Sequence, residues 1–198
     1  AFNWRGIFGV HTWIAVKPAG AAFYRRLEVM GWGVGRGREA VRIRRGDPDG
    51  LWFGSRPEVL AHLQGPEAAA AIPAILVAAR DYPHNHEYRI WPGPNSNTFI
   101  AYIGRRVPAL RLDLPPNAIG KDYIAGGALL AHSPSGRGVQ LSLGGLAGLM
   151  VGFEEGLEIN LLGLSAGLDF NPPALKLPGL GRLGLSQETN HPATVGSN

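Results

Sequence analysis

Two segments of the chain carry side chains whose types and spacing suit catalysis. The first, residues 10–14, holds His11 within a stretch rich in β-branched and aromatic residues. The second, residues 91–99, places Asn95, Ser96 and Asn97 after a Pro-Gly-Pro turn, where a helix N-terminus is expected. A serine at such a position suits a nucleophile, because a histidine can take its proton and free N–H groups of the first helical turn can hold an oxyanion.

A third group is needed to orient the imidazole of such a site. If the strand that holds His11 returns as a hairpin, position 11 lies opposite position 28 or 29, so Glu28 is the first candidate. Asn95 and Asn97 are alternatives, because an amide oxygen accepts a hydrogen bond from a ring N–H. A non-catalytic interpretation stays open: Ser96 and Asn95 are also good helix caps, and His11 also suits a half-buried strand.

The elements that position these residues follow from hydrophobic spacing and turn residues. Helical spacing of apolar residues predicts a helix over 57–81, kinked or divided at Pro73. A second helix begins with Asn95 or Ser96 as its N-cap and continues over 98–107. Strands are expected at 7–17 and 23–32, which form an antiparallel hairpin, and at 41–44, 51–53 and 88–91.

The C-terminal part changes character, because leucine, glycine and valine dominate residues 138–168. This composition predicts a β-meander with strands at about 138–143, 147–153 and 157–164. Apolar residues on both faces of that meander would imply burial, or contact with a membrane or a partner. The expected architecture is a single α+β domain: an antiparallel sheet with packed helices over 1–135, a glycine- and leucine-rich β segment over 136–186 and a loose tail over 187–198.

Composition narrows the function further. The 198 residues are 45% hydrophobic and 17% charged, which indicates a packed globular protein. The absence of cysteine excludes disulfides, thiolate metal sites and a cysteine nucleophile. No metal or other cofactor is expected, because His84 and His86 have no third ligand nearby in the sequence. No nucleic acid partner is expected either, because the net charge is only +4 and the basic cluster at 36–45 is interspersed with acidic residues.

The segments HTWIAVKPAGA, EVMGWGV, WPGPNSNTFIA, PPNAIGKDY and GLEINLLGLSAGLD resemble a bacterial family catalogued only as a domain of unknown function. The resemblance extends over nearly the whole chain. It implies a location at the bacterial cell envelope, membrane-associated or periplasmic, because members often carry an N-terminal hydrophobic tether. The sequence shows no such segment, as expected of a processed or trimmed form. The family brings no activity.

A second resemblance is to circularly permuted papain-like hydrolases of the lecithin:retinol acyltransferase and NlpC type. In these, a strand histidine precedes a helix-capping Asn-Cys-x-x-Phe motif that supplies the nucleophile. His11 matches the histidine, and residues 95–99 match the motif with Ser96 in the place of cysteine. A serine hydroxyl is far less acidic than a thiol, so Ser96 needs a general base during the reaction.

Two hypotheses about function follow. The first is a hydrolase or acyl/amide transferase with Ser96 as nucleophile, His11 as base, and Glu28, Asn95 or Asn97 as the group that orients His11. The second is a non-catalytic, membrane-associated structural protein or complex subunit that uses the apolar 138–168 region to contact a membrane surface or a membrane protein complex.

Overall fold

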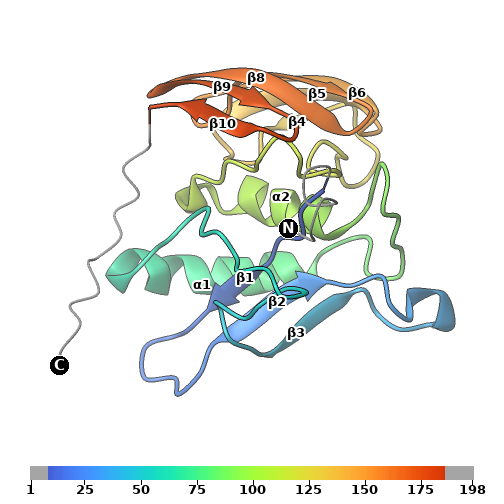
Figure 1. Ribbon diagram of the computed structural model, residues 1–198. Helices are drawn as coiled ribbons and strands as arrows, with labels where there is room; N and C mark the ends of the chain where they lie inside the picture. The colour runs from blue at the N-terminus through green and yellow to red at the C-terminus, as the bar shows by residue number, and fades with distance from the viewer. Residues whose placement is uncertain (1–8, 186–198) are drawn as a thin grey trace.

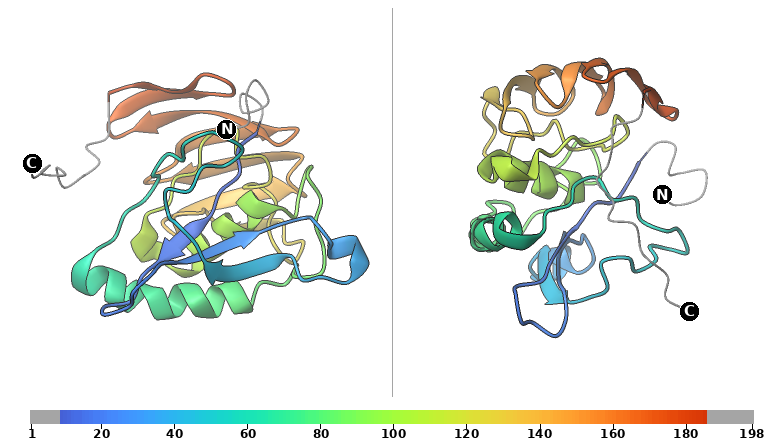
Figure 2. Two further views of the ribbon diagram at one scale, coloured as in Figure 1. Left: turned by 60° about the horizontal axis from the view of Figure 1, so that its bottom comes forward. Right: turned by 90° about the vertical axis from the view of Figure 1, so that its left-hand side faces the viewer.

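Two antiparallel sheets lie on opposite sides of one buried helix in the computed structural model, which describes residues 9–185 (Figures 1 and 2). A three-stranded sheet and the helix α1 lie on one side of the helix α2. A seven-stranded sheet formed by the C-terminal part of the chain covers the other side. The α+β fold class expected from the sequence is confirmed, whereas the predicted tail over 187–198 lies outside the described residues.

The small sheet has the strand order β1-β2-β3, and its strands are Ile14–Val16, Arg25–Val29 and Val41–Arg45. The predicted hairpin is confirmed, with shorter strands than 7–17 and 23–32. Two predicted strands are wrong. Residues 51–53 contribute only an isolated bridge from Trp52 to Ser55, and residues 88–91 form no strand because the Arg89 N–H donates to the Pro94 carbonyl in a turn.

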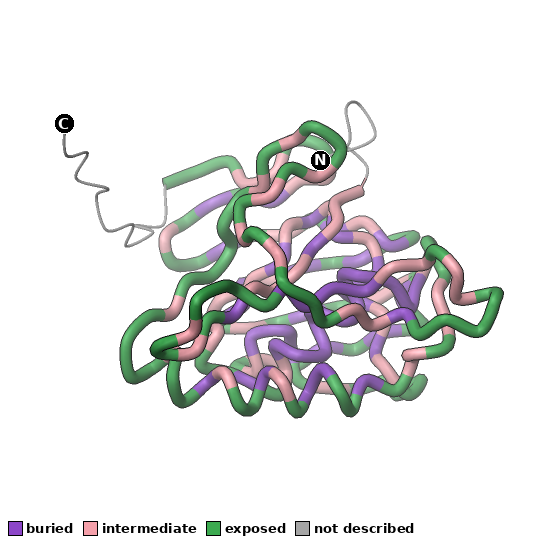
Figure 3. The backbone as a smooth tube through the Cα atoms, turned by 90° about the horizontal axis from the view of Figure 1, so that it is seen from below, coloured by how far each residue is buried: buried purple, intermediate pink, exposed green. Residues whose placement is uncertain are grey.

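The helix α1 spans Gly65–Arg80, so it begins eight residues later than predicted, with Pro66 in its first turn. It also continues through Pro73, where the sequence suggested a kink or a division. Pro73 and the residue four positions before it, Ala69, are both exposed, so water can bond the carbonyl that the proline leaves free. The buried residues of α1 recur on one face, which packs inward, while the opposite face is exposed (Figure 3).

The helix α2 spans Ser96–Arg106 and begins as the sequence predicts, with Asn95 as its N-cap. Asn95 and Thr98 form a capping box, in which each side chain accepts from the other residue's backbone N–H. All nine residues from Ser96 to Gly104 are buried, as expected of a helix between two layers. The Tyr102 hydroxyl donates to the Asp81 carbonyl at 2.7 Å and thereby ties α2 to the end of α1.

The large sheet is a meander in which each strand pairs antiparallel with its neighbour in sequence, so β4 and β10 are its edges. The three predicted strands are confirmed as β5, β6 and β7, whereas β4 and the strands from β8 onward were not predicted. The seven strands are Leu130–His132, Gly138–Leu143, Ala147–Gly152, Gly156–Leu161, Leu164–Phe170, Pro173–Leu177 and Gly181–Gly184.

The two faces of this sheet have opposite polarity, and the polar face is the buried one. In register across the sheet, the inner row includes Gln140, Glu158 and Lys176, all buried. The outer row beside it includes Leu149 and Ile159, both exposed. Apolar residues therefore cover only one face: β5, β7, β8 and β9 carry polar side chains inward and apolar side chains outward, while β6 places Met150 between two glycines on the inner face.

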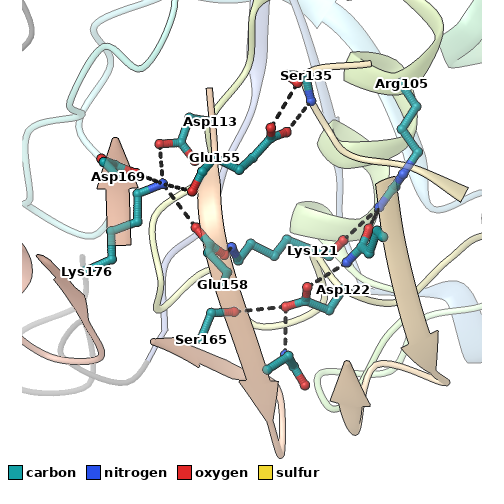
Figure 4. A network of polar contacts seen from close by, with 12 residues as sticks. Arg105, Asp113, Lys121, Asp122, Ser135, Glu155, Glu158, Ser165, Asp169 and Lys176 are labelled. Carbon is teal, nitrogen blue, oxygen red and sulfur yellow. Dashed lines mark hydrogen bonds and ion pairs between the residues drawn. The ribbon is translucent and has the colours of Figure 1, made fainter. Parts of the chain in front are cut away.

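The polar face is fastened to the middle layer by buried ion pairs and hydrogen bonds (Figure 4). The Lys176 Nζ contacts Asp113, Glu158 and Asp169 at 2.6, 3.0 and 2.9 Å. Lys121, from the loop after α2, pairs with the second oxygen of Glu158. We call this set the ion cluster.

The neighbouring residue Asp122 is bound in the same way. Its two carboxylate oxygens accept from Gln140, Asn160 and Ser165 on three strands, at 2.6, 2.7 and 3.1 Å. Lys121 and Asp122 are both buried beneath the sheet, so they neither line a groove nor form a surface salt bridge.

Removing one cation from the ion cluster leaves buried carboxylates without a partner. We therefore expect Lys176→Met to lower the free energy of unfolding by about 3–5 kcal/mol, measured by urea denaturation at neutral pH. The matched control is Arg137→Gln, which breaks the more exposed pair with Glu154 and costs at most about 1 kcal/mol. Equal losses in the two variants would show that the cluster does not hold the sheet.

Candidate active site

The candidate site begins with His11, which lies just before β1 and whose side chain is 11% exposed. Its Nε2 lies 3.3 Å from the Glu28 Oε2, so the residue expected to orient the imidazole does contact it. The register of β1 and β2 pairs Ile14 with Leu27. If this register is extended toward the N-terminus, position 11 lies opposite position 30. The ring therefore reaches back along β2 to meet Glu28.

Glu28 is fully buried and is bound by two arginines besides His11. Arg26 donates to its Oε2 at 2.7 and 3.0 Å, and Arg44 donates to its Oε1 at 2.8 and 3.3 Å. Burial alone would raise the pKa of Glu28, but the hydrogen bonds from His11, Arg44 and Arg26 outweigh it and lower the pKa to about 2. Glu28 therefore stays ionised and holds the Nε2 side of the His11 ring at neutral pH.

Tryptophans surround the other sides of His11. The imidazole stacks on Trp52 with ring centroids 3.9 Å apart and lies 6.0 Å from Trp13. The Arg26 guanidinium lies 3.9 Å above the Trp13 ring, a cation–π contact. Trp13 lies two residues after His11, so its ring can approach the imidazole from the same side of an extended segment.

A cleft of about 560 Å³ opens beside His11. Trp32 and Trp91 in its wall are 65% and 49% exposed, so they present ring surface to solvent. Gly31 allows the Tyr88 ring to pack against the backbone, because a Cβ there would lie 2.4 Å from that ring. The full lining is His11, Val29, Met30, Gly31, Trp32, Trp52, Tyr88, Ile90 and Trp91.

Asn95 has a structural role at the start of α2. Its Oδ1 accepts from the N–H groups of Asn97 and Thr98, and its Nδ2 donates to the carbonyls of Ile90 and Ile119 at 2.9 Å each. Gly120, at φ +96°, passes so close that a Cβ would lie 2.4 Å from the Asn95 amide. The structure does not bring Asn95 to the imidazole; its hydrogen bonds instead fix the helix end between two loops.

Asn97 joins α2 to the segment that holds His11. Its Nδ2 donates to the Val10 carbonyl at 3.0 Å and to the Ile119 carbonyl at 2.8 Å, and its Oδ1 accepts from the Thr12 hydroxyl at 2.9 Å. The residues on both sides of His11 therefore bond to the residue that follows Ser96. This places the two candidate catalytic residues on adjacent segments, although Asn97 itself binds neighbours of His11 and not its ring.

Ser96 is 4% exposed and forms the first residue of α2. The Asn97 and Thr98 N–H groups bind Asn95, so the first turn has fewer free donors for an oxyanion than the sequence suggested. Within residues 9–185, the Ser96 hydroxyl makes no hydrogen bond and Ser96 does not line the cleft. Thr12 bonds to Asn97, whereas the ring of the preceding residue His11 stacks on Trp52. A Ser96–His11 catalytic pair stays a prediction.

A family model described as "Protein of unknown function (DUF3750)" matches residues 1–123. The chain belongs to this family. The DUF3750 match includes every candidate site residue as well as Lys121 and Asp122, and it ends before the seven-stranded sheet begins. Comparison with curated proteins finds no match, and comparison with solved structures finds none either. The papain-like resemblance and the envelope location therefore stay predictions.

Several residues of the site were missed by sequence reasoning. Arg26 had a detectable signal, since it lies two positions from Glu28 and so on the same face of a strand. Arg44 lies on the strand paired with β2, and from the sequence it was considered only as part of the basic cluster at 36–45. Trp52 was missed because residues 51–53 were predicted as a strand, whereas they form only an isolated bridge and Trp52 stacks on His11. In the described part of the chain, no helix is long and apolar enough to span a membrane.

The lowered pKa of Glu28 makes part of the stability dependent on pH. Glu28 ionises near pH 2 in the folded protein and near 4.5 without its partners, so it contributes stability above about pH 4.5 and loses it as the pH falls toward 2. We expect Glu28→Gln to lower the free energy of unfolding at neutral pH by roughly 3 kcal/mol and to flatten its dependence on acid pH, measured by urea denaturation at several pH values.

The control for this variant is Glu87→Gln, which removes a half-exposed carboxylate that pairs with His84 and Arg89. Its cost is at most about 1 kcal/mol. If Glu28→Gln kept the wild-type dependence on acid pH, the assignment of that dependence to Glu28 would be wrong.

Proposed function

We propose that this protein is a hydrolase or acyl transferase in which Ser96 is the nucleophile, His11 the general base and Glu28 the group that orients His11. The observation that carries the proposal is the contact of His11 with the buried Glu28 at the wall of an open aromatic cleft. The Asn97 hydrogen bonds to both neighbours of His11 support it, because they hold this segment against the N-terminus of α2.

The proposed chemistry begins with attack of the Ser96 oxygen on an ester or amide carbonyl. His11 takes the hydroxyl proton and returns it to the departing alcohol or amine, which leaves an acyl group on Ser96. Water, or an acceptor alcohol or amine, then attacks the acyl carbon and restores the free serine. Glu28 stays ionised throughout and stabilises the imidazolium that forms after the first proton transfer.

Formation of this pair requires movement of the His11 ring. In the structure the ring stacks on Trp52, while Ser96 is buried at the N-terminus of α2, next to Asn97. Catalytic hydrogen bonds often become short only in the complex with substrate. A substrate group that displaces the ring from Trp52 would leave Nδ1 to accept the serine proton, with Nε2 still held by Glu28.

The lining of the cleft favours an uncharged acyl group. Three tryptophans and Tyr88 supply most of the side-chain surface, and His11 is the one titratable side chain besides Tyr88 among the described lining residues. Aromatic walls bind flat or apolar groups through dispersion and burial of surface. Neutral esters with aliphatic or aromatic acyl groups are therefore the first substrates to test.

We expect the wild-type protein to react with a fluorophosphonate probe and to hydrolyse p-nitrophenyl esters, and we expect Ser96→Ala to abolish both. His11→Gln should lower the hydrolysis rate by about 100-fold or more, because it removes the general base. The measurements are mass spectrometry of the labelled protein and the release of p-nitrophenol.

The matched control is Ser55→Ala, since Ser55 is more exposed than Ser96 and bonds to Trp52 through its backbone. Labelling and hydrolysis should persist in that variant. If Ser96→Ala reacted like the wild type, Ser96 would have only a structural role at the start of α2. The non-catalytic interpretation of 95–97 would then replace the proposal.

A further inference from the structure

The outer face of the seven-stranded sheet is apolar from β5 to β9, and His132 on the edge strand β4 lies at its margin. Large aliphatic residues lie in register on neighbouring strands, and those near the centre are between 40% and 66% exposed: Leu141, Leu149, Ile159, Leu161, Leu168 and Leu175. We call this surface the outer face. In the described chain, the outward positions from β5 to β9 include no charged and no amide side chain.

The sheet cannot turn this face inward, because the opposite face carries the ion cluster. Lys176 and Glu158 are almost fully buried against the middle layer, together with Gln140 and Asn160. Exposing them and burying the leucines would require new partners for every charged group of the cluster. The apolar side therefore stays directed away from the rest of the described chain, and Figures 1 and 2 show the sheet as an outer layer of the molecule.

The size of the outer face suits a stable interface. Seven strands about 4.8 Å apart, with an average length of about five residues at about 3.3 Å per residue, give a flat area of about 600 Å². Side chains that stand out from the sheet add to the accessible area, and a standard interface buries about 800 Å² per partner. Monomeric proteins rarely expose an apolar patch larger than about 300–600 Å².

We propose that the outer face packs against the same face of a second copy of this chain. An interface without charges needs no complementary partner, and two such faces related by a twofold axis complement each other. The dimer would be a two-sheet sandwich, with the sheets about 10 Å apart. This inference is independent of the proposed catalytic role, because no residue of the outer face lines the cleft beside His11.

The geometry of a twofold sandwich identifies the most sensitive residue. In the strand order, β7 is the middle strand, and Ile159 lies between Leu149 and Ala166 near its centre. A twofold axis that passes between the two faces over their centre brings Ile159 opposite the same residue of the second copy. A lysine at this position would bury two facing ammonium groups without partners.

The test measures the mass of the full chain in solution by sedimentation velocity and light scattering at micromolar concentrations. The wild-type protein should be a dimer, and Ile159→Lys should weaken dimerisation by about 100-fold or more. The matched control is Ile43→Lys on β3, an isoleucine that is 41% exposed in the other sheet, and this variant should remain dimeric. Far-ultraviolet circular dichroism checks that both variants fold, as expected since Ile159 is 60% exposed.

A second measurement uses the absence of cysteine from the chain. Ile159→Cys introduces a single thiol at the centre of the outer face, and a short bismaleimide should link two copies in high yield. Ile43→Cys, treated in the same way, should stay uncrosslinked.

Three results would overturn the proposal. The first is a wild-type protein that is monomeric at all concentrations. The second is a dimer that persists in Ile159→Lys, because its interface would then lie elsewhere. A monomer that floats with vesicles of phosphatidylcholine and phosphatidylglycerol, and loses this binding in Ile159→Lys, would assign the outer face to a lipid surface instead.

Discussion

The placement of the large sheet depends on the pairing of charges that are largely or fully buried. Lys176 lies among Asp113, Glu158 and Asp169, and Lys121 completes the set from the loop after α2. Burial raises the pKa of Asp113 to about 7, although the neighbouring Lys176 lowers it. A charge without a partner at this depth is costly, so the sheet has one favourable orientation on the middle layer. Because the charged face is turned inward, the apolar face of the sheet points outward.

A similar dependence holds around the candidate active site, where the joining residue is neutral. Asn97 bonds to the strand segment around His11 and to the Ile119 carbonyl, while its own backbone is capped by Asn95. Three segments distant in sequence therefore meet at one helix end. Ile119 lies two residues before Lys121, so the loop that closes the helix end also carries a cation to the large sheet. The two polar centres of the molecule are thus connected by a few residues of backbone.

Local chemistry explains which parts of this structure were predictable. The N-cap at Asn95 follows from a proline turn before a polar and then apolar run, and the hairpin that brings Glu28 to His11 follows from two strand-like segments and a turn. The strands β5, β6 and β7 are separated by turns with positive-φ glycines, which the composition marks clearly. The start of α1 was less predictable, because apolar residues at helical spacing also occur before Gly65, where no helix forms.

Interactions between distant residues explain the rest. The burial of Lys121 could not be predicted, because its partner Glu158 lies 37 residues further along the chain, in a strand whose inner face the sequence did not reveal. The stacking of the His11 ring on Trp52 could not be predicted either, because the two residues are distant in sequence and Trp52 lies in a segment without regular structure. The sequence predicted the Glu28 partner, but it gave no sign of Arg44 on the third strand.

The meander order of the large sheet has a consequence for how the chain folds. Every strand from β4 to β10 pairs with the strand next to it in sequence, so the sheet contains only hairpin contacts of short range. Short loops close at little entropic cost, and local contacts speed folding. We therefore expect the hairpins to form early and singly. The contacts that cross long stretches of chain, from residues 113 to 122 to the strands, then become the kinetic bottleneck at which the finished sheet docks.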